Sequence, residues 1–201
     1  MRLWFNPASP FARKVRVVAR EAGLDGRIEE VGIMVSPVKP HAELARENPL
    51  VKIPALSTDL GTLYDSAVIC EYLDSLHGGK AMFPKAGAER WKALRLQALG
   101  DGILEAAVLM RYEGAVRPQP LQWGDWVAGQ LGKVRSGLDA LERECADWRD
   151  CFAIGEITAA CVLGYLDFRF PDEAWRKSHP ALEKWYAGIS QRPSMKATVP
   201  L

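Results

Sequence analysis

The sequence of 201 residues is 48% hydrophobic and 25% charged, and its formal net charge is +1 at pH 7. This length and apolar content suit one or two compact domains with a hydrophobic core. The nearly balanced charge argues against a protein that binds nucleic acid through electrostatics.

The first predicted elements are a strand, a turn and a helix within residues 3–22. Three apolar residues lead into a turn that contains prolines, and apolar residues then recur at helical spacing at positions 11, 15, 18 and 22. We expect Ser9 to cap this helix and Pro10 to stand in its first turn. A hydroxyl at that place lies where the helix start favours an anion. Ser9 is therefore either a plain N-cap or part of an anion-binding site.

Three arginines of the same predicted helix, Arg13, Arg16 and Arg20, fall on one of its faces. No block of like charges accompanies them. We therefore interpret them as a solvated face and expect their charged groups to meet water.

A proline stands between two short apolar stretches in the segment around Ile53 and Pro54. Such a proline is tolerated at the start or edge of a strand, or in a cis turn. A cis bond would turn the backbone groups of Ile53 outward, where they could pair with an extended peptide. An ordinary trans proline at a strand edge is the alternative.

Asp65 and Ser66 precede a predicted amphipathic helix, whose apolar residues lie at positions 68, 69, 72, 73 and 76. Position 69, three residues after Ser66, is Ile and not Glu, so no capping box occupies the free N–H donors. A ligand carboxylate could dock at Ser66, with Asp65 available to an ammonium group. Simple helix capping is the alternative.

Residues 78–86 break the periodicity and predict a linker after a first domain of residues 1–77. Apolar residues then follow helical spacing from Trp91 to Met110 and from Trp123, through Trp126, to Leu141, which predicts two long antiparallel helices. A third helix, from about residue 157 to 168, is apolar on nearly every face, so we expect it to be the buried centre of a bundle. A further helix starts at residues 179–180. The second domain, residues 87–201, is thus predicted to be all-helical.

The three N-terminal segments, in this order, resemble the thioredoxin-like half of the glutathione S-transferase family, with Ser9 in the position of the catalytic hydroxyl or thiol. Residues 164–169, 192–194, 111–113 and 117–118 look like parts of the C-terminal half of bacterial glutathione transferases. The resemblance covers nearly the whole chain. It implies an α/β thioredoxin-like domain of βαβ-ββα order, followed by an all-α helical bundle.

The implied activity is activation of glutathione, a co-substrate, as a thiolate that attacks small hydrophobic electrophiles. An unperturbed thiol has a pKa of about 8.5, and lowering it by about two units takes roughly 2.7 kcal/mol. A hydrogen bond from the Ser9 hydroxyl to a charged acceptor supplies about 1.5–3 kcal/mol, and the helix end about 0.3–1 kcal/mol. These contributions suffice without a general base.

The resemblance also implies a cis bond before Pro54, backbone pairing of Ile53 with the cysteinyl unit, and recognition of the γ-glutamyl end by Asp65 and Ser66. The remaining candidate glutathione contacts are Phe11, Lys39, Lys52, Pro54 and Asp101. Of these, Lys39 and Lys52 would bind the glycyl carboxylate, and Asp101 would reach the glutathione of the other subunit of a homodimer. The electrophile pocket would be lined by Trp4, Phe11, Met110 and Arg111.

One departure from the family pattern concerns the start of the buried helix. The family has a Ser or Thr cap followed three residues later by Asp, whereas this chain has Ala153 and Glu156. The missing cap oxygen should cost roughly 1 kcal/mol, while the acidic partner can still bond back.

Two other functions remain open from the sequence. A protein of this fold can serve as a non-catalytic ligand-binding or protein-interaction module. A thiol-disulfide reductase would need a cysteine, but Ser9 and Ala12 stand where a Cys-Pro-x-Cys motif would be. The sequence does not distinguish detoxification from a dedicated metabolic step.

The cysteines, at positions 70, 145, 151 and 161, show no Cys-x-x-Cys spacing, and the histidines at 41, 77 and 179 are scattered. We therefore expect no metal site and buried structural thiols. The longest uncharged apolar run, residues 157–166, is too short to span a bilayer, and no signal peptide is evident. These features lead us to expect a soluble cytoplasmic protein with reduced thiols and no membrane partner.

Overall fold

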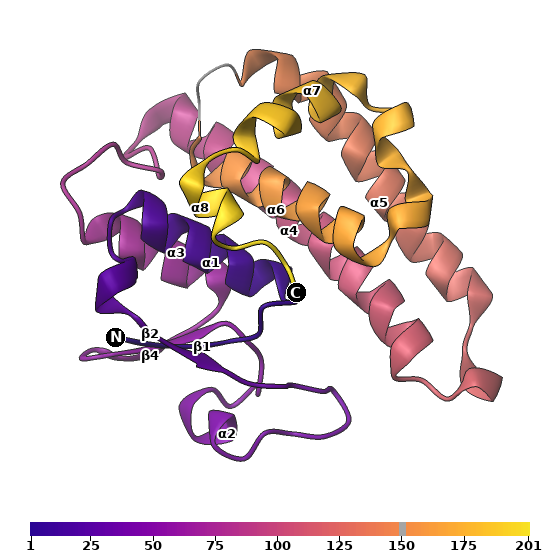
Figure 1. The fold of residues 1–201 in the computed structure, drawn as a ribbon, viewed down its shortest axis with the longest axis horizontal. Coiled ribbons are helices and arrows are strands. Elements are labelled where there is room, and N and C mark those ends of the chain that lie inside the picture. Colours follow the sequence, from indigo (N-terminus) through magenta and orange to yellow (C-terminus); the bar gives the residue numbers. More distant parts are fainter. Residues whose placement is uncertain (149–151) are drawn as a thin grey trace. The chain divides into compact units, whose positions relative to one another are not determined.

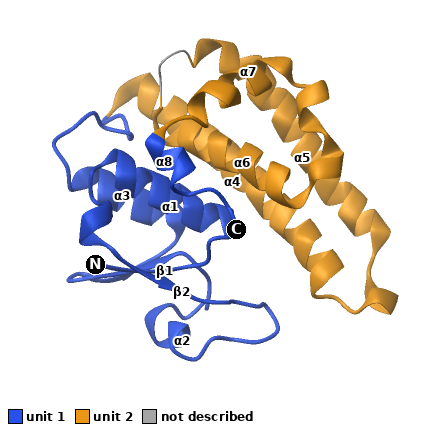
Figure 2. Cartoon of the chain, in the orientation of Figure 1, with its two compact units in different colours: residues 1–85, 193–201 blue, residues 86–192 orange. Residues whose placement is uncertain are grey.

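The computed structural model, which describes residues 1–148 and 152–201, divides the chain into two compact units (Figures 1 and 2). The first unit contains Met1–Lys85 together with Pro193–Leu201, and the second contains Ala86–Arg192. The sequence alone assigned all residues after 86 to the helical half.

The first unit is built on a four-stranded sheet in the order β2-β1-β3-β4. Its strands are β1 (Arg2–Phe5), β2 (Glu29–Gly32), β3 (Ala55–Thr58) and β4 (Gly61–Leu63). Strands β1 and β2 are parallel, whereas β3 is antiparallel to both β1 and β4. This mixed sheet confirms the predicted thioredoxin-like order of elements.

Helices cover both faces of this sheet, as Figure 1 shows. Helices α1 (Pro10–Glu21) and α3 (Ser66–Ser75) lie on one face, and the short α2 (Leu44–Glu47) lies on the other. A 3-10 turn, η1 (Asp25–Arg27), follows α1. Because side chains alternate along a strand, Leu3 and Trp4 of β1 point to opposite faces, and both are buried. Trp4 packs with Leu44 of α2.

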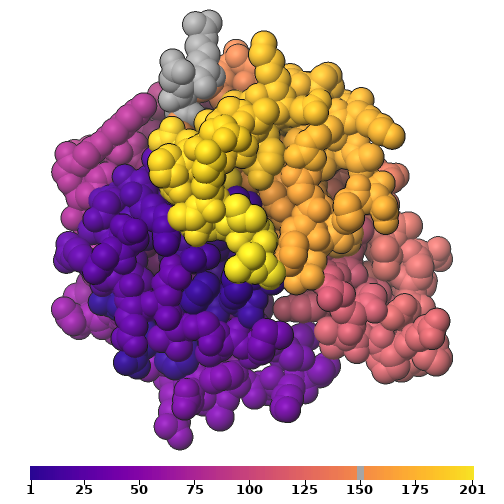
Figure 3. All heavy atoms as spheres, viewed as in Figure 1, coloured from indigo at the N-terminus to yellow at the C-terminus, as the bar shows by residue number. Residues whose placement is uncertain are grey.

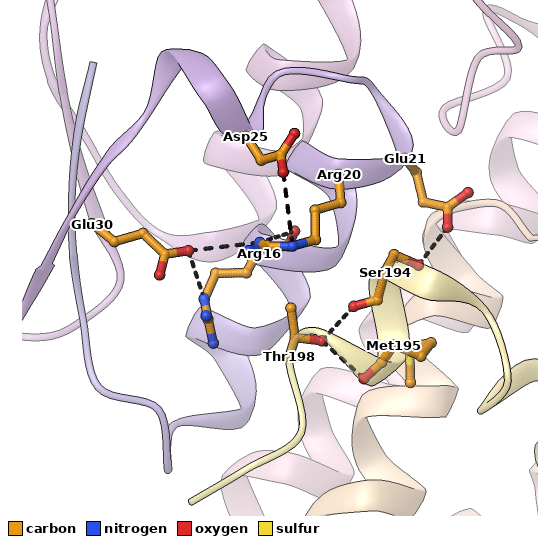
Figure 4. A network of polar contacts seen from close by, with 8 residues as sticks. All are labelled: Arg16, Arg20, Glu21, Asp25, Glu30, Ser194, Met195 and Thr198. Carbon is orange, nitrogen blue, oxygen red and sulfur yellow. Dashed lines mark hydrogen bonds and ion pairs between the residues drawn. The ribbon is translucent and has the colours of Figure 1, made fainter.

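The last residues of the chain fold onto α1. This segment contains a short helix, α8 (Pro193–Lys196), within the first unit. The Ser194 hydroxyl donates to Glu21, the last residue of α1, at 2.5 Å, and the Thr198 hydroxyl donates to the Ser194 carbonyl oxygen at 2.8 Å (Figure 4). The periodicity of the sequence did not predict that the last residues pack on the first unit.

The second unit is helical, as predicted. Its helices are α4 (Gly87–Ala115), α5 (Gly124–Glu144), α6 (Ile154–Arg169) and α7 (Pro180–Ile189), with 3-10 turns η2 (Gln119–Leu121), η3 (Cys145–Asp147), η4 (Pro171–Glu173) and η5 (Trp175–Lys177). Helix α6 is buried at every residue from 154 to 166, which confirms its central position within this unit. It begins at Ile154, earlier than the apolar run alone predicts.

Three tryptophans that contribute to the apolar spacing of the predicted helices are not buried. Trp91 is 70% exposed, Trp123 is 61% exposed and Trp126 is 42% exposed. The last two lie at the start of α5, where the α4–α5 hairpin extends past α6 (Figure 1). In this part of the hairpin, the described residues of α6 do not run alongside α5 (Figure 1).

The arginines of α1 require a correction, because they do not form a solvated face. Arg13 is 3% exposed, and the side chain of Arg16 is 12% exposed and lies 2.7 Å from Glu30. Arg20 reaches the same carboxylate at 3.6 Å (Figure 4). Strand β2 and the C-terminal segment cover this face, and both come from parts of the sequence that helical periodicity does not describe.

The predicted buried thiols are found at Cys70, Cys145 and Cys161, and Cys151 lies outside the described residues. Burial raises the pKa of the Cys145 thiol to about 11. Within residues 1–148 and 152–201, no group of histidine, cysteine or acidic side chains is arranged to hold a metal ion. Over the same residues, every helix is too short or too polar to cross a bilayer.

Candidate functional site

Ser9 stands at the start of α1, at the end of a tight turn. The Ser9 N–H donates to the Asn6 carbonyl oxygen at 2.9 Å, and the Asn6 side chain accepts from Ala8 N–H at 2.9 Å. Ser9 has extended backbone angles, and its Oγ accepts from Ala12 N–H at 3.2 Å. The predicted N-cap is therefore confirmed.

The same geometry leaves the Ser9 hydroxyl proton available to a ligand. Oγ acts as an acceptor toward Ala12, and it donates to no partner among the described residues. Pro10 has no N–H, and the Ala12 N–H is taken by Ser9, so the first turn offers few backbone donors. The side chain is half-buried. An anion bound here would depend mainly on the hydroxyl group.

The turn before Pro54 is held by Asn48, which is 1% exposed. Its side-chain amide donates to the Lys52 carbonyl oxygen at 2.9 Å, while its Oδ1 accepts from Leu50 N–H at 3.0 Å. The sequence-based predictions missed Asn48, although an Asn-Pro pair is a known turn signal. Val51 has a φ of 51° in this turn, a left-handed conformation that is rare for a β-branched residue.

The Ile53–Pro54 peptide bond is cis, as the resemblance implied, and the Tyr64–Asp65 bond is cis as well. The ladder between β1 and β3 begins at Ala55. The backbone of Ile53 therefore lies outside the ladder, where an extended peptide could pair with it.

Asp65, and not Ser66, caps α3. The Asp65 backbone is extended, and its Oδ1 accepts from Ala67 N–H at 3.1 Å. Ser66 is the first residue of the helix and is 3% exposed. The third residue after this cap is Val68, which has no acceptor for a capping box, whereas the sequence-based prediction placed the cap at Ser66 and the third residue at Ile69.

The sheet brings these three segments to one end. Trp4 pairs with Ala55, so the end of β1 and the start of β3 lie together. Leu56 pairs with Leu63, which brings the end of β4 to the same place. Ser9, Ile53 and Asp65 follow or precede these strand ends by a few residues. The fold therefore gathers the predicted glutathione-binding segments within the first unit.

The remaining candidates divide between the two units. In the first unit Lys39 and Lys52 are exposed, Phe11 is half-buried and Trp4 is 5% exposed. In the second unit Asp101 is half-buried, Met110 is 8% exposed and Arg111 is exposed. The Trp4 Nε1 is buried without a hydrogen-bond partner among the described residues. Their roles stay predictions.

Comparison with known proteins points to one family. The model of the glutathione S-transferase N-terminal domain matches residues 8–76, and that of the C-terminal domain matches residues 124–188. A protein of Escherichia coli K12 described as an uncharacterized GST-like protein, YibF, is 32% identical over 204 residues, which cover 100% of this chain and 98% of that protein.

Two solved structures are similar over the full length. A glutathione transferase family member from Pseudomonas fluorescens Pf-5, with bound glutathione, is 50% identical with a TM-score of 0.97, covering 100% of this chain and 98% of the other. A glutathione S-transferase from Methylobacillus flagellatus KT, also with glutathione bound, is 35% identical with a TM-score of 0.90, and covers 100% and 99%.

Proposed function

This chain belongs to the glutathione S-transferase family, and we propose that it activates the glutathione thiol as a thiolate for attack on small hydrophobic electrophiles. The observation that carries the proposal is the Ser9 hydroxyl, which caps α1 as an acceptor and keeps its own proton available to a bound sulfur. Glutathione bound in the similar structures supports the choice of ligand.

In this mechanism Ser9 donates its O–H to the sulfur and favours the thiolate over the thiol. A hydrogen bond to a charged acceptor stabilises it by about 1.5–3 kcal/mol, which corresponds to a pKa lowered by about one to two units. The proton leaves to solvent, and the thiolate attacks the electrophile. No general base is needed for this step.

The other binding roles follow from the gathered segments. The Ile53 backbone, outside the β-ladder, would pair with the cysteinyl unit. Asp65 and the buried Ser66 would hold the γ-glutamyl end at the start of α3. Lys39 and Lys52 are the candidates for the glycyl carboxylate, because both are exposed cations of the first unit.

The remaining candidates concern the ring of Phe11 and the electrophile. Phe11, in the first turn of α1, would contact glutathione and also line the electrophile pocket. The family resemblance also implies Trp4, Met110 and Arg111 for that pocket, of which Trp4 belongs to the first unit and the other two to the second.

The test is an ultraviolet difference titration of bound glutathione in the wild type and in Ser9→Ala. We expect a thiolate signal at neutral pH in the wild type and its loss in Ser9→Ala, because this variant removes the O–H donor to the sulfur along with the Oγ that accepts from Ala12 N–H. Ser75→Ala is the matched control, since the Ser75 hydroxyl is exposed in α3 and bonds to the Tyr72 carbonyl oxygen. It should titrate like the wild type.

Two outcomes would contradict the proposal. If glutathione binds but stays a thiol in both proteins, the chain is a ligand-binding module of the same fold. If glutathione does not bind at all, the ligand assignment is wrong. Thiol-disulfide reductase activity that survives Ser9→Ala would remove Ser9 as the agent of such a reaction.

We further propose that the protein forms a homodimer in which Asp101 of one subunit approaches the glutathione of the other. The exposed Trp91 of α4 supports an apolar contact, because an aromatic side chain that is 70% exposed in one chain is typical of interface residues. Sedimentation at micromolar protein concentration should show a dimer. A monomer would remove both the dimer and the role of Asp101.

A further inference from the structure

Arg13 is a buried cation whose donors are largely unused. It is 3% exposed, and its Nη2 donates to the Met195 carbonyl oxygen at 3.3 Å. Its Nε and Nη1 are buried without a hydrogen-bond partner among the described residues. A guanidinium has five N–H donors, and leaving a buried charge unpaired costs several kcal/mol. Such a group calls for a functional explanation.

The other arginines of α1 differ from Arg13 because their charges are compensated. Arg16 lies 2.7 Å from Glu30, and Arg20 lies 3.6 Å from Glu30 and 4.0 Å from Asp25 (Figure 4). Among the three arginines of α1, Arg13 is therefore the one whose charge could still be compensated by a bound anion.

Among the described residues, no carboxylate lies within ion-pair distance of the Arg13 guanidinium. Glu21 accepts from the Ser194 hydroxyl at the far end of α1. Lys14 is a cation, like Lys196 of α8. Glu71 of α3 is exposed.

Arg13 lies one helical turn after Ser9. Arg13 lies four residues after the cap, and its N–H donates to the Ser9 carbonyl oxygen at 2.9 Å. Helical side chains point back toward the N-terminus and cover the preceding turn. The preceding turn here is the one that begins at Ser9, where backbone donors are few.

We propose that Arg13 is a positioning residue whose uncompensated charge favours the thiolate form of glutathione bound at Ser9. This inference rests on the proposed function. The thiol releases its proton to solvent, and no bond to Arg13 forms. The charge acts through the buried start of α1, and the Met195 carbonyl holds the guanidinium in place. Ser9 then contributes the direct hydrogen bond to the sulfur, and Arg13 contributes electrostatic attraction for the thiolate.

The experiment compares the thiol pKa of bound glutathione in full-length wild type, Arg13→Met, Arg13→Lys and Arg16→Met. We expect Arg13→Met to raise this pKa by about one unit, a tenfold loss of thiolate well below the pKa. Arg13→Lys keeps the charge and should retain most of the wild-type shift. Arg16→Met is the matched control and should leave the pKa nearly unchanged, because the charge of Arg16 is paired with Glu30.

A second comparison keeps the inference testable if Arg13→Met does not fold. Arg13→Gln removes the charge but keeps an N–H donor for the Met195 carbonyl. Its affinity for glutathione near pH 7.5 should fall up to tenfold, while its affinity for S-methylglutathione, which has no ionisable thiol, should not change.

Three results separate the inference from the proposed function. A folded Arg13 variant with a wild-type thiol pKa overturns the inference and leaves the proposed function intact. Equal loss of affinity for both ligands means a purely structural role for Arg13 and also overturns it. Glutathione that titrates near pH 8.5 on the wild type removes the proposed function, and this inference with it.

Discussion

At the scale of single residues, the start of α6 lacks the side-chain oxygen that an N-cap serine or threonine would supply. Ala153 has the extended backbone of an N-cap, and its N–H donates to Glu156 Oε2 at 3.1 Å. This is one half of a reciprocal cap, because alanine has no side-chain acceptor to satisfy a first-turn N–H. The next thirteen residues of α6 are all buried, so water is a poor substitute there.

We predict that Ala153→Ser raises the free energy of unfolding by about 1 kcal/mol, because the new hydroxyl can accept from the first turn of α6. For a chain of this size the melting temperature should rise by about 2–4 °C. Ala153→Val adds volume without an acceptor and should give no gain. An unchanged or lower melting temperature for Ala153→Ser would mean that the cap is not at this residue.

At the scale of elements, one of the two glycines that flank Asp101 lets α4 approach α6 closely. A Cβ added at Gly100 would lie 2.7 Å from Thr158 Cγ2, and Thr158 is fully buried with its hydroxyl bonded to the Ile154 carbonyl oxygen. A Cβ added at Gly102 would meet nothing within 4 Å. The glycines that flank Asp101 therefore have different roles, although they look equivalent in the sequence.

We predict opposite effects for Gly100→Ala and Gly102→Ala on chemical unfolding. Helix propensity alone favours alanine by about 1 kcal/mol at both positions, so Gly102→Ala should stabilise the protein by up to that amount. Gly100→Ala should destabilise it by about 1–2 kcal/mol, because Thr158 is held and the overpacking outweighs propensity. Equal effects from the two substitutions would show that α4 and α6 do not pack at Gly100.

The apolar periodicity of the sequence predicted the helices and strands better than it predicted which of their residues are buried by other parts of the chain. The continuous apolar stretch at Leu3 and Trp4 and the apolar run of α6 predicted a strand and a central helix, because burial on both faces or all round leaves a direct pattern. The exposure of Trp123 and the burial of Arg13 were not readable. A pattern shows which residues share a face, whereas the neighbour on that face comes from a distant part of the chain.

The features of the candidate site also fall into two groups: those that the local sequence predicts and those that depend on distant parts of the chain. Ser9 as a cap and the helix after Asp65 follow from local turn and capping chemistry, which a sequence carries in a few residues. Ser9, Ile53 and Asp65 come to one end of the sheet only through the pairing of the strands. The hydrogen bond from the Asn48 amide to the Lys52 carbonyl oxygen depends on the turn between these two residues. Only the structure supplies these contacts.

At the scale of the whole molecule, the first unit is completed by the last residues of the chain. Met195 is 1% exposed, and Thr198 is also 1% exposed. The Met195 carbonyl oxygen accepts from Arg13 near the start of α1. The Ser194 hydroxyl donates to Glu21 at the end of α1 (Figure 4). In Figure 3 the yellow atoms of the last residues lie against the indigo atoms of the N-terminal part. During synthesis these contacts can form only after the second unit has been made.

We predict that Met195→Ala selectively loosens the first unit. Removing a fully buried methionine side chain lowers the free energy of unfolding by about 2–5 kcal/mol. Here the loss cannot exceed the free energy with which the C-terminal segment binds to the rest of the first unit. Amide hydrogen exchange should therefore quicken at Val15 and Val17 of α1 while the α6 amides keep their protection, because local opening exposes only the unit concerned. Lys196→Ala, at an exposed neighbour, should stay within about 0.5 kcal/mol of the wild type. Equal loss of protection in α1 and α6 would instead mean that the two units unfold as one.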